Sequence, residues 1–244
     1  MTPAPRGGGD AITLSGPPHN TAAVVPHDLS RDKVVPVSIS VAGQSTIYRA
    51  VVRSFGSDGG EMRLRLPRDT PPGTYKGEST IGGKQLGIVV EVEPVMRIRV
   101  LPKQTVLEAA ASSSVEFGLT VRNAGNVPFD VPKGDVLDFD DAVEQERALG
   151  RSLRAPLKQG ESRVDRFFDE LRASHGGEAR VTVKSGAGRL APGESRELAC
   201  VLDVPGAVQP GRTYAGTWQF GNTGHVILAE IIATGRPKNG RTQP

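Results

Sequence analysis

Short runs in which every second residue is apolar recur along the chain and predict β-strands that each bury one face. In residues 34–41 the aliphatic side chains alternate with Pro36, Ser38 and Ser40. Gly- and Pro-rich turns separate the runs, an arrangement typical of a β-sandwich. The runs lie at residues 34–41, 47–52, 62–66, 86–92, 95–100, 115–121, 127–131, 180–184, 198–204, 214–220 and 226–232.

A Pro-Gly corner that leads into a tyrosine occurs twice, as PGTYKG at residues 72–77 and PGRTYAG at residues 210–216. Each copy follows an alternating strand that ends in proline, and each precedes a turn and a Val/Ile-rich strand. The repeat predicts two β-sandwiches in tandem. We expect Tyr75 and Tyr214 to return their phenols to nearby backbone, as in a tyrosine corner. Gly77 and Gly216, two residues later, suit close packing or a bulge.

These patterns divide the chain into four consecutive parts. Residues 1–30 are rich in Gly and Pro and predict a flexible lead-in, from which residues 11–14 can add a strand to the first domain. Residues 31–94 predict the first sandwich and residues 95–235 the second, with a boundary so short that the two abut. Residues 236–244 predict a disordered tail.

A helical insertion at residues 138–175 distinguishes the second sandwich from the first. Ser162 and Asp165 resemble a capping box. An apolar stripe follows at positions i, i+3, i+4 and i+7, and Gly176-Gly177 is expected to end the helix. A second helix is predicted earlier, at residues 140–154, and the two helices are expected to pack as a hairpin. The stripe either binds a partner or covers exposed core and edge strands; it consists of Val164, Phe167, Phe168 and Leu171.

Composition excludes several classes of function. The 244 residues carry a net charge of +3, without a basic run or an aromatic platform, so no nucleic-acid partner is expected. No apolar stretch is long enough to span a membrane, and the N-terminus shows no export signal. The cytoplasm is therefore the expected location, or an extracytoplasmic one if an upstream leader is missing. Cys200, the single cysteine, is expected to be an inert core thiol rather than a reactive one.

Catalytic and metal-binding signals are sparse, and we predict neither an enzyme nor a cofactor. Motifs for serine hydrolases, zinc proteases and nucleotide binding are absent. The four histidines are expected at the surface. Four carboxylates at residues 135–141 suggest either a calcium loop or, as we favour, acids at a helix N-terminus. The histidines are His19, His27, His175 and His225, and the carboxylates are Asp135, Asp138, Asp140 and Asp141.

Three pairs of arginines alternate along predicted strands, so both members of each pair project from one face. If their strands share a sheet, they form a basic surface for anionic glycan, lipid headgroups or an acidic partner. The alternative, which we favour, is the ordinary solvated face of a half-buried sheet. The pairs are Arg49 with Arg53, Arg63 with Arg65 and Arg97 with Arg99.

Trp218 shares its alternation with Tyr214 and Phe220 and is expected in the core.

The turns of the second domain give it a family resemblance. Residues 123–127 read NAGNV, residues 191–195 read APGES, and the second Pro-Gly corner precedes the last two strands. In this order they resemble the bacterial Ig-like domains appended to α-galactosidases and the related CARDB-type cell-surface domains. The resemblance covers residues 96–233, apart from the insertion, and only residues 62–92 of the first domain. It implies a non-catalytic spacer, adhesion or assembly module.

We therefore expect an interaction module that binds a protein or cell-surface partner through the insertion, an edge strand or a sheet face. A two-domain chaperone that donates residues 86–92 as an edge strand is the alternative. An accessory domain of a hydrolase that binds anionic glycan is a third. A covered edge at residues 86–92 with an exposed Phe167 or Phe168 would favour the insertion. The sequence does not specify the oligomeric state.

Overall fold

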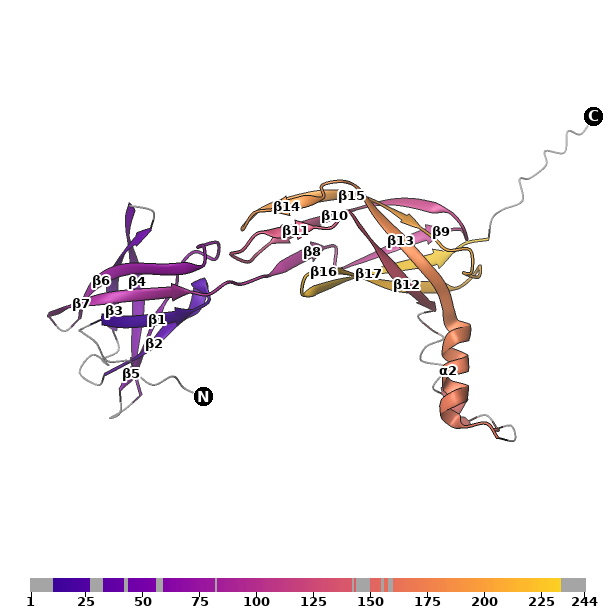
Figure 1. Ribbon diagram of the computed structural model, residues 1–244, viewed down its shortest axis with the longest axis horizontal. Helices are drawn as coiled ribbons and strands as arrows, with labels where there is room; N and C mark the ends of the chain where they lie inside the picture. The colour runs from indigo at the N-terminus through magenta and orange to yellow at the C-terminus, as the bar shows by residue number, and fades with distance from the viewer. Residues whose placement is uncertain are drawn as a thin grey trace, which may run out of the picture. The chain divides into compact units, whose positions relative to one another are not determined.

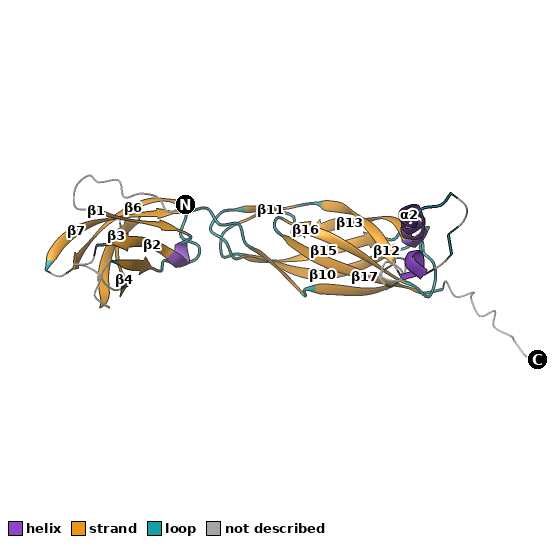
Figure 2. Cartoon of the chain, turned by 90° about the horizontal axis from the view of Figure 1, so that it is seen from below, coloured by secondary structure: helices purple, strands orange, loops and turns teal. Residues whose placement is uncertain are grey.

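The computed structural model describes residues 11–26, 33–41, 44–55, 59–81, 83–141, 143, 150–154, 156–157 and 160–233. The chain is mostly β and forms two compact units (Figure 1). The first unit comprises the chain up to Arg97 together with residues 123–128 and 191–194, and the second comprises the remainder. The predicted fold class, two tandem β-sandwich units with a small helical insertion in the second, is confirmed (Figure 2).

Seven strands of the first unit form one sheet that closes on itself in the order β1-β2-β5-β4-β3-β6-β7. Alternate residues of these strands point inward and form an aliphatic core. The seam between β3 and β6 is only three residue pairs long. The strands are β1 (Ala11–Gly16), β2 (Thr21–Val25), β3 (Lys33–Val41), β4 (Gln44–Ser54), β5 (Gly60–Leu64), β6 (Gly73–Ile81) and β7 (Lys84–Val92), with the 3-10 helix η1 (Pro18–Asn20) between β1 and β2.

Residues 11–14 lie in β1 and add a strand to the first unit, as predicted, whereas the predicted flexible lead-in is wrong for residues 15–25, which complete β1 and form η1 and β2. Strand β1 pairs in parallel with β7 over six residues, and Leu14 is fully buried. Strand β7 also pairs with β6 over its whole length. Both backbone edges of β7 are therefore occupied.

Eight strands of the second unit form a sheet in the order β8-β10-β15-β13-β12-β16-β17-β9, and β11 pairs separately with β14. Its core centres on Trp218, Phe220 and Phe139, each fully buried. The rings of Trp218 and Phe220 lie 4.3 Å apart. The strands are β8 (Ile98–Leu101), β9 (Gln104–Ala109), β10 (Ser114–Asn123), β11 (Phe129–Val131), β12 (Gly134–Asp141), β13 (His175–Ser185), β14 (Gly188–Leu190), β15 (Ser195–Asp203), β16 (Thr213–Phe220) and β17 (Thr223–Ile231).

Both corner tyrosines form hydrogen bonds to backbone a few residues upstream. Tyr75 Oη donates to the Pro71 carbonyl at 2.7 Å, and Tyr214 Oη accepts from the Gln209 amide at 3.2 Å. The corner glycines have no room for a side chain. A Cβ on Gly77 would collide with the Ser38 carbonyl, and a Cβ on Gly216 would lie 2.8 Å from the Phe139 ring. Each glycine therefore allows a close packing contact beside its corner.

The turn at residues 123–128 belongs to the first unit through the side chain of Asn126. Asn126 Nδ2 donates to the carbonyls of Thr70 and Glu93 at 3.0 and 2.9 Å, and Oδ1 accepts from the Val95 amide at 2.6 Å. A Cβ on Gly125 would collide with the Val95 carbonyl. Asn126 is almost completely buried, so these bonds satisfy backbone groups that water reaches poorly.

Candidate functional site

The helical insertion extends the tip of the β12–β13 hairpin. Asp140 and His175 form the last residue pair of the hairpin before the insertion, and the register shifts there. Asp140 Oδ1 lies 3.3 Å from His175 Nδ1. The predicted start at residue 138 is wrong, because residues 138–141 continue strand β12. The insertion therefore comprises residues 142–174, and among its described residues 150–154 and α2 (Arg163–Ser174) are helical.

Helix α2 begins with the predicted capping box. The Ser162 side chain accepts from the Asp165 amide at 3.1 Å, and the Asp165 carboxylate accepts from the Ser162 amide at 3.3 Å. The predicted glycine stop is wrong, because the helix ends at Ser174 and the chain passes directly into β13. Gly176 instead lies where a Cβ would come within 2.5 Å of the Tyr214 ring, and Gly177 has a φ of +95°.

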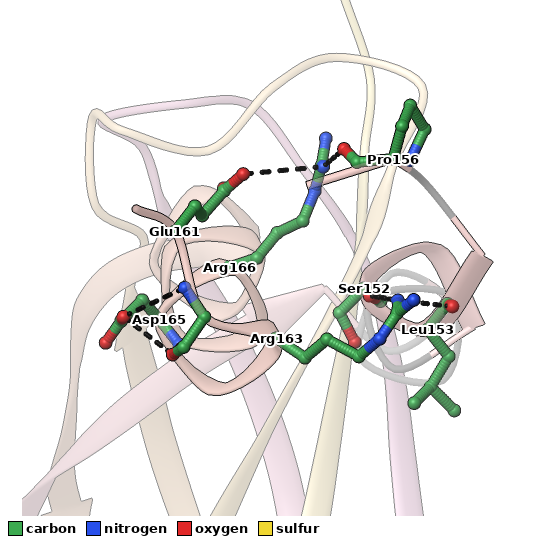
Figure 3. A network of polar contacts seen from close by, with 8 residues as sticks. Ser152, Leu153, Pro156, Glu161, Arg163, Asp165 and Arg166 are labelled. Atoms are coloured by element: carbon green, nitrogen blue, oxygen red, sulfur yellow. Dashed lines mark hydrogen bonds and ion pairs between the residues drawn. The ribbon is translucent and has the colours of Figure 1, made fainter. Parts of the chain in front are cut away.

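Polar contacts join α2 to described residues that precede it in the insertion (Figure 3). Arg163 Nη1 donates to the carbonyls of Ser152, at 3.0 Å, and Leu153, at the end of helical residues 150–154. Arg166 donates to the Pro156 carbonyl and lies 3.7 Å from Glu161. A cation at the C-terminal end of a helix is favourable, because the last carbonyls carry partial negative charge.

A second ion pair adds to this arrangement. Arg151 Nε lies 2.8 Å from the Glu170 carboxylate, which joins the 150–154 segment to the middle of α2. Both side chains are partly exposed, so the pair contributes little free energy by itself. Together with the bonds from Arg163 and Arg166, it fixes how the two helical segments lie against each other.

Among the described residues of the insertion, no apolar side chain belongs to the core of the second unit. Val164 is 61% exposed and Phe168 is 53% exposed, while Phe167 and Leu171 are half-buried. Leu153 and Leu157, which precede α2, are also exposed. We call Leu153, Leu157, Val164 and Phe168 the apolar insertion set. The apolar stripe predicted from the sequence includes Val164 and Phe168. It does not include Leu157, because that residue lies outside any helical repeat.

The four carboxylates at residues 135–141 do not gather in one place. All belong to β12, so the predictions of a calcium loop and of a helix N-terminus are both wrong. Asp141 is buried and lies 3.1 Å from Arg212, whereas Asp140 faces His175. Within the residues that the structure describes, no group of three His, Cys, Asp or Glu side chains is arranged to hold a metal ion.

The predicted arginine pairs fall on different elements. Arg49 and Arg53 lie on β4 and Arg63 on the adjacent β5, all exposed on the outer face of the first unit, with Arg65 just after β5. Arg97 follows β7 outside any strand, and Arg99 lies on β8 of the second unit. The structure therefore brings together Arg49, Arg53 and Arg63, whereas Arg97 and Arg99 do not belong to that face.

Two residues of the second unit are buried as their alternation predicts. Cys200 is 2% exposed, and burial raises the pKa of its thiol to about 11, as expected of an inert core cysteine. Trp218 is fully buried, so it cannot serve as a ligand platform.

The predicted surface position is wrong for His225, which is fully buried on β17 with Nε2 2.9 Å from Thr105 Oγ1. Burial lowers its pKa. His19 and His175 are exposed, and His27 lies outside the described residues.

Comparison with protein-family models and with characterised proteins finds no match for this sequence. Solved structures that resemble it include a titin structure at 11% identity and a TM-score of 0.31, covering 92% of this chain and 97% of that one. A protein of unknown function from Porphyromonas gingivalis W83 matches at 10% identity and a TM-score of 0.25, covering 91% and 97%. The extracellular portion of mouse CD200RLa matches at 8% and 0.29, covering 91% and 98%. Scores this low do not identify a function. No described helix is long and apolar enough to cross a membrane.

Proposed function

We propose that the chain is a non-catalytic interaction module that docks an apolar groove of a protein partner through the apolar insertion set. The observation that supports this proposal most directly is the exposure of Val164 and Phe168 on a helix that polar contacts join to the 150–154 segment. Protein–protein interfaces favour large apolar anchors that are presented rigidly, because little conformational entropy is then lost on binding.

The alternatives find less support. A lid over the sandwich would bury its apolar side chains, whereas Val164 and Phe168 are exposed. Donation of β7 to a partner would require a free edge, and β7 pairs with β6 on one side and β1 on the other. The bacterial Ig-like and CARDB-type domains that the turns resemble are non-catalytic adhesion or assembly modules, which agrees with the proposed role.

The test compares capture of partners by the wild type and by a Val164→Ser/Phe168→Ser variant. The matched control is Asp169→Ser/Arg172→Ser, which changes two side chains of the same helix that are 70% and 81% exposed. Removal of two interface anchors typically costs about 2 kcal/mol or more, so affinity should fall at least about thirtyfold.

Partners identified by quantitative mass spectrometry are then purified and titrated by calorimetry. The proposal predicts that a captured partner binds the wild type and the control equally and loses affinity for the Val164→Ser/Phe168→Ser variant. Equal affinity for all three proteins would show that the insertion is not the docking surface.

A further inference from the structure

The outer face of β4 alternates large apolar and basic side chains. Ile47, Arg49, Val51 and Arg53 point outward, because Ala50 and Val52 between them are buried in the core. Phe55 follows directly after the strand. Ile47 is 72% exposed and Phe55 is 63% exposed, values that are high for such side chains on a folded domain.

Neighbouring strands continue this pattern on the same face. Val51 lies opposite Val34 of β3 on one side and Arg63 of β5 on the other. Val34 is 61% exposed, and Val24 on β2 is 74% exposed. We call this surface the β4 outer face; it consists of Val24, Val34, Ile47, Arg49, Val51, Arg53, Phe55, Glu61 and Arg63.

The positive charge of this face is only partly neutralised. Arg63 lies 2.6 Å from the carboxylate of Glu61 on the same strand. Arg49 and Arg53 have no ion-pair partner among the residues that the structure describes. Glu61 lies directly opposite Arg53 in the β4–β5 pair, but its carboxylate contacts the Arg63 guanidinium. The face therefore carries three arginines and one glutamate, so its net charge is positive.

We propose that the β4 outer face docks on the surface of an anionic lipid bilayer. Binding at a bilayer interface combines burial of apolar side chains at the headgroup–acyl boundary with attraction between cations and anionic headgroups. Guanidinium groups suit this role because they bind phosphate oxygens in a bidentate manner. Phe55, at the end of the strand, suits the same boundary.

An acidic protein would fit this face less well. Because the apolar and basic side chains alternate residue by residue, a rigid partner would need a pocket beside every carboxylate in matching register. A fluid interface needs no such match, since lipids rearrange laterally around each side chain. This is why the alternation, rather than the charge alone, favours a bilayer.

The experiment is sedimentation of the full chain with vesicles of phosphatidylcholine alone or with an equal part of phosphatidylglycerol. The wild type should bind the anionic vesicles more tightly, and the binding should weaken as salt is added. Arg49→Gln/Arg53→Gln should weaken it about thirtyfold, since each arginine near such a surface contributes about a fivefold change. Ile47→Ser/Val51→Ser should weaken it as well.

Two controls show whether a loss of vesicle binding comes from Arg49 and Arg53 themselves. Arg122→Gln/Lys184→Gln removes the same charge from exposed positions on β10 and β13 and should bind like the wild type. Circular dichroism shows whether each variant is folded. If the Arg49→Gln/Arg53→Gln variant is not folded, the salt dependence of wild-type binding and the affinity of the Ile47→Ser/Val51→Ser variant test the proposal instead.

Binding of the wild type equally to both kinds of vesicle, or to neither, would overturn the proposal. So would an Arg49→Gln/Arg53→Gln variant that retains full affinity. Full binding by Ile47→Ser/Val51→Ser, together with competition by polyglutamate, would instead indicate a simple polyanion site of the kind an acidic protein occupies. The Val164→Ser/Phe168→Ser variant should bind vesicles normally, since that surface lies in the insertion.

Discussion

Replacing Arg163 with methionine should loosen the insertion without weakening the core of the second unit. Methionine keeps the length of the side chain and its helix propensity but cannot donate to the carbonyls of Ser152 and Leu153. Bonds from a charged donor contribute about 1.5–3 kcal/mol each at their strongest. Because Arg163 is solvent-exposed, we expect both together to contribute only about 1–2 kcal/mol to local stability.

Hydrogen exchange measured by mass spectrometry follows this change directly. A local loss of about 1–2 kcal/mol corresponds to exchange that is about 5- to 30-fold faster in peptides covering α2. The thermal unfolding of the second unit should hardly change, since none of its described core residues comes from the insertion. The affinity for a partner docked on the apolar insertion set should fall, because that set is no longer held in one orientation.

Arg172→Met is the matched control, because it removes an arginine from the same helix that contacts Asp169 at the surface rather than the 150–154 segment. Such a pair contributes about 0.5 kcal/mol or less, so exchange should change by about twofold or less. Equal exchange in the two variants would refute the idea that Arg163 joins the helical segments. A large drop in the thermal stability of Arg163→Met would show that the insertion supports the core after all.

Two further predictions concern the core of the second unit. Gly216→Ala should lower the free energy of unfolding by about 1–3 kcal/mol in chemical denaturation, because the added Cβ would lie 2.8 Å from the Phe139 ring. Gly118→Ala is the control and should cost much less, because the nearest neighbour of its Cβ would be 3.7 Å away. Burial lowers the pKa of His225 in the folded protein, so the unfolded state binds a proton at His225 more readily. The free energy of unfolding should therefore fall as the pH drops below about 6.5, the unfolded pKa of histidine, and through the lower folded pKa. His225→Gln should reduce the loss of thermal stability between about pH 7 and about pH 5; an unchanged loss would assign it to other groups.

The positions of most strands could be predicted because alternation of apolar residues records which face is buried. The same rule explains two errors. Leu137 and Phe139 are buried at alternate positions of β12, a strand signal that the flanking aspartates concealed. His225 continues the inward alternation of Ile227 and Ala229, so its burial was visible in the pattern although histidine is more often exposed.

Other features had no local signal. The strand at residues 11–14 was predicted, but its parallel partner β7 was not, because β7 lies far away in the sequence and has its own antiparallel partner. Asn126 satisfies backbone groups at Thr70, Glu93 and Val95, and no periodicity links those positions. Likewise, no periodicity of apolar residues links Arg163 to the carbonyls of Ser152 and Leu153 to which it donates. The stripe on α2 could be predicted, but its exposure depends on what packs against it.

The two proposed surfaces obtain their affinity from different physical terms, and this separates them experimentally. Docking through Val164 and Phe168 rests on apolar burial, which added salt leaves intact or strengthens. Docking through Arg49 and Arg53 rests partly on charge attraction, which the same salt screens. The surfaces also lie on different units, so substitutions on one should leave the other unchanged. A protein partner retained at high salt while vesicles are released would therefore show that the chain binds both independently, as expected of a module that attaches a protein to an anionic membrane.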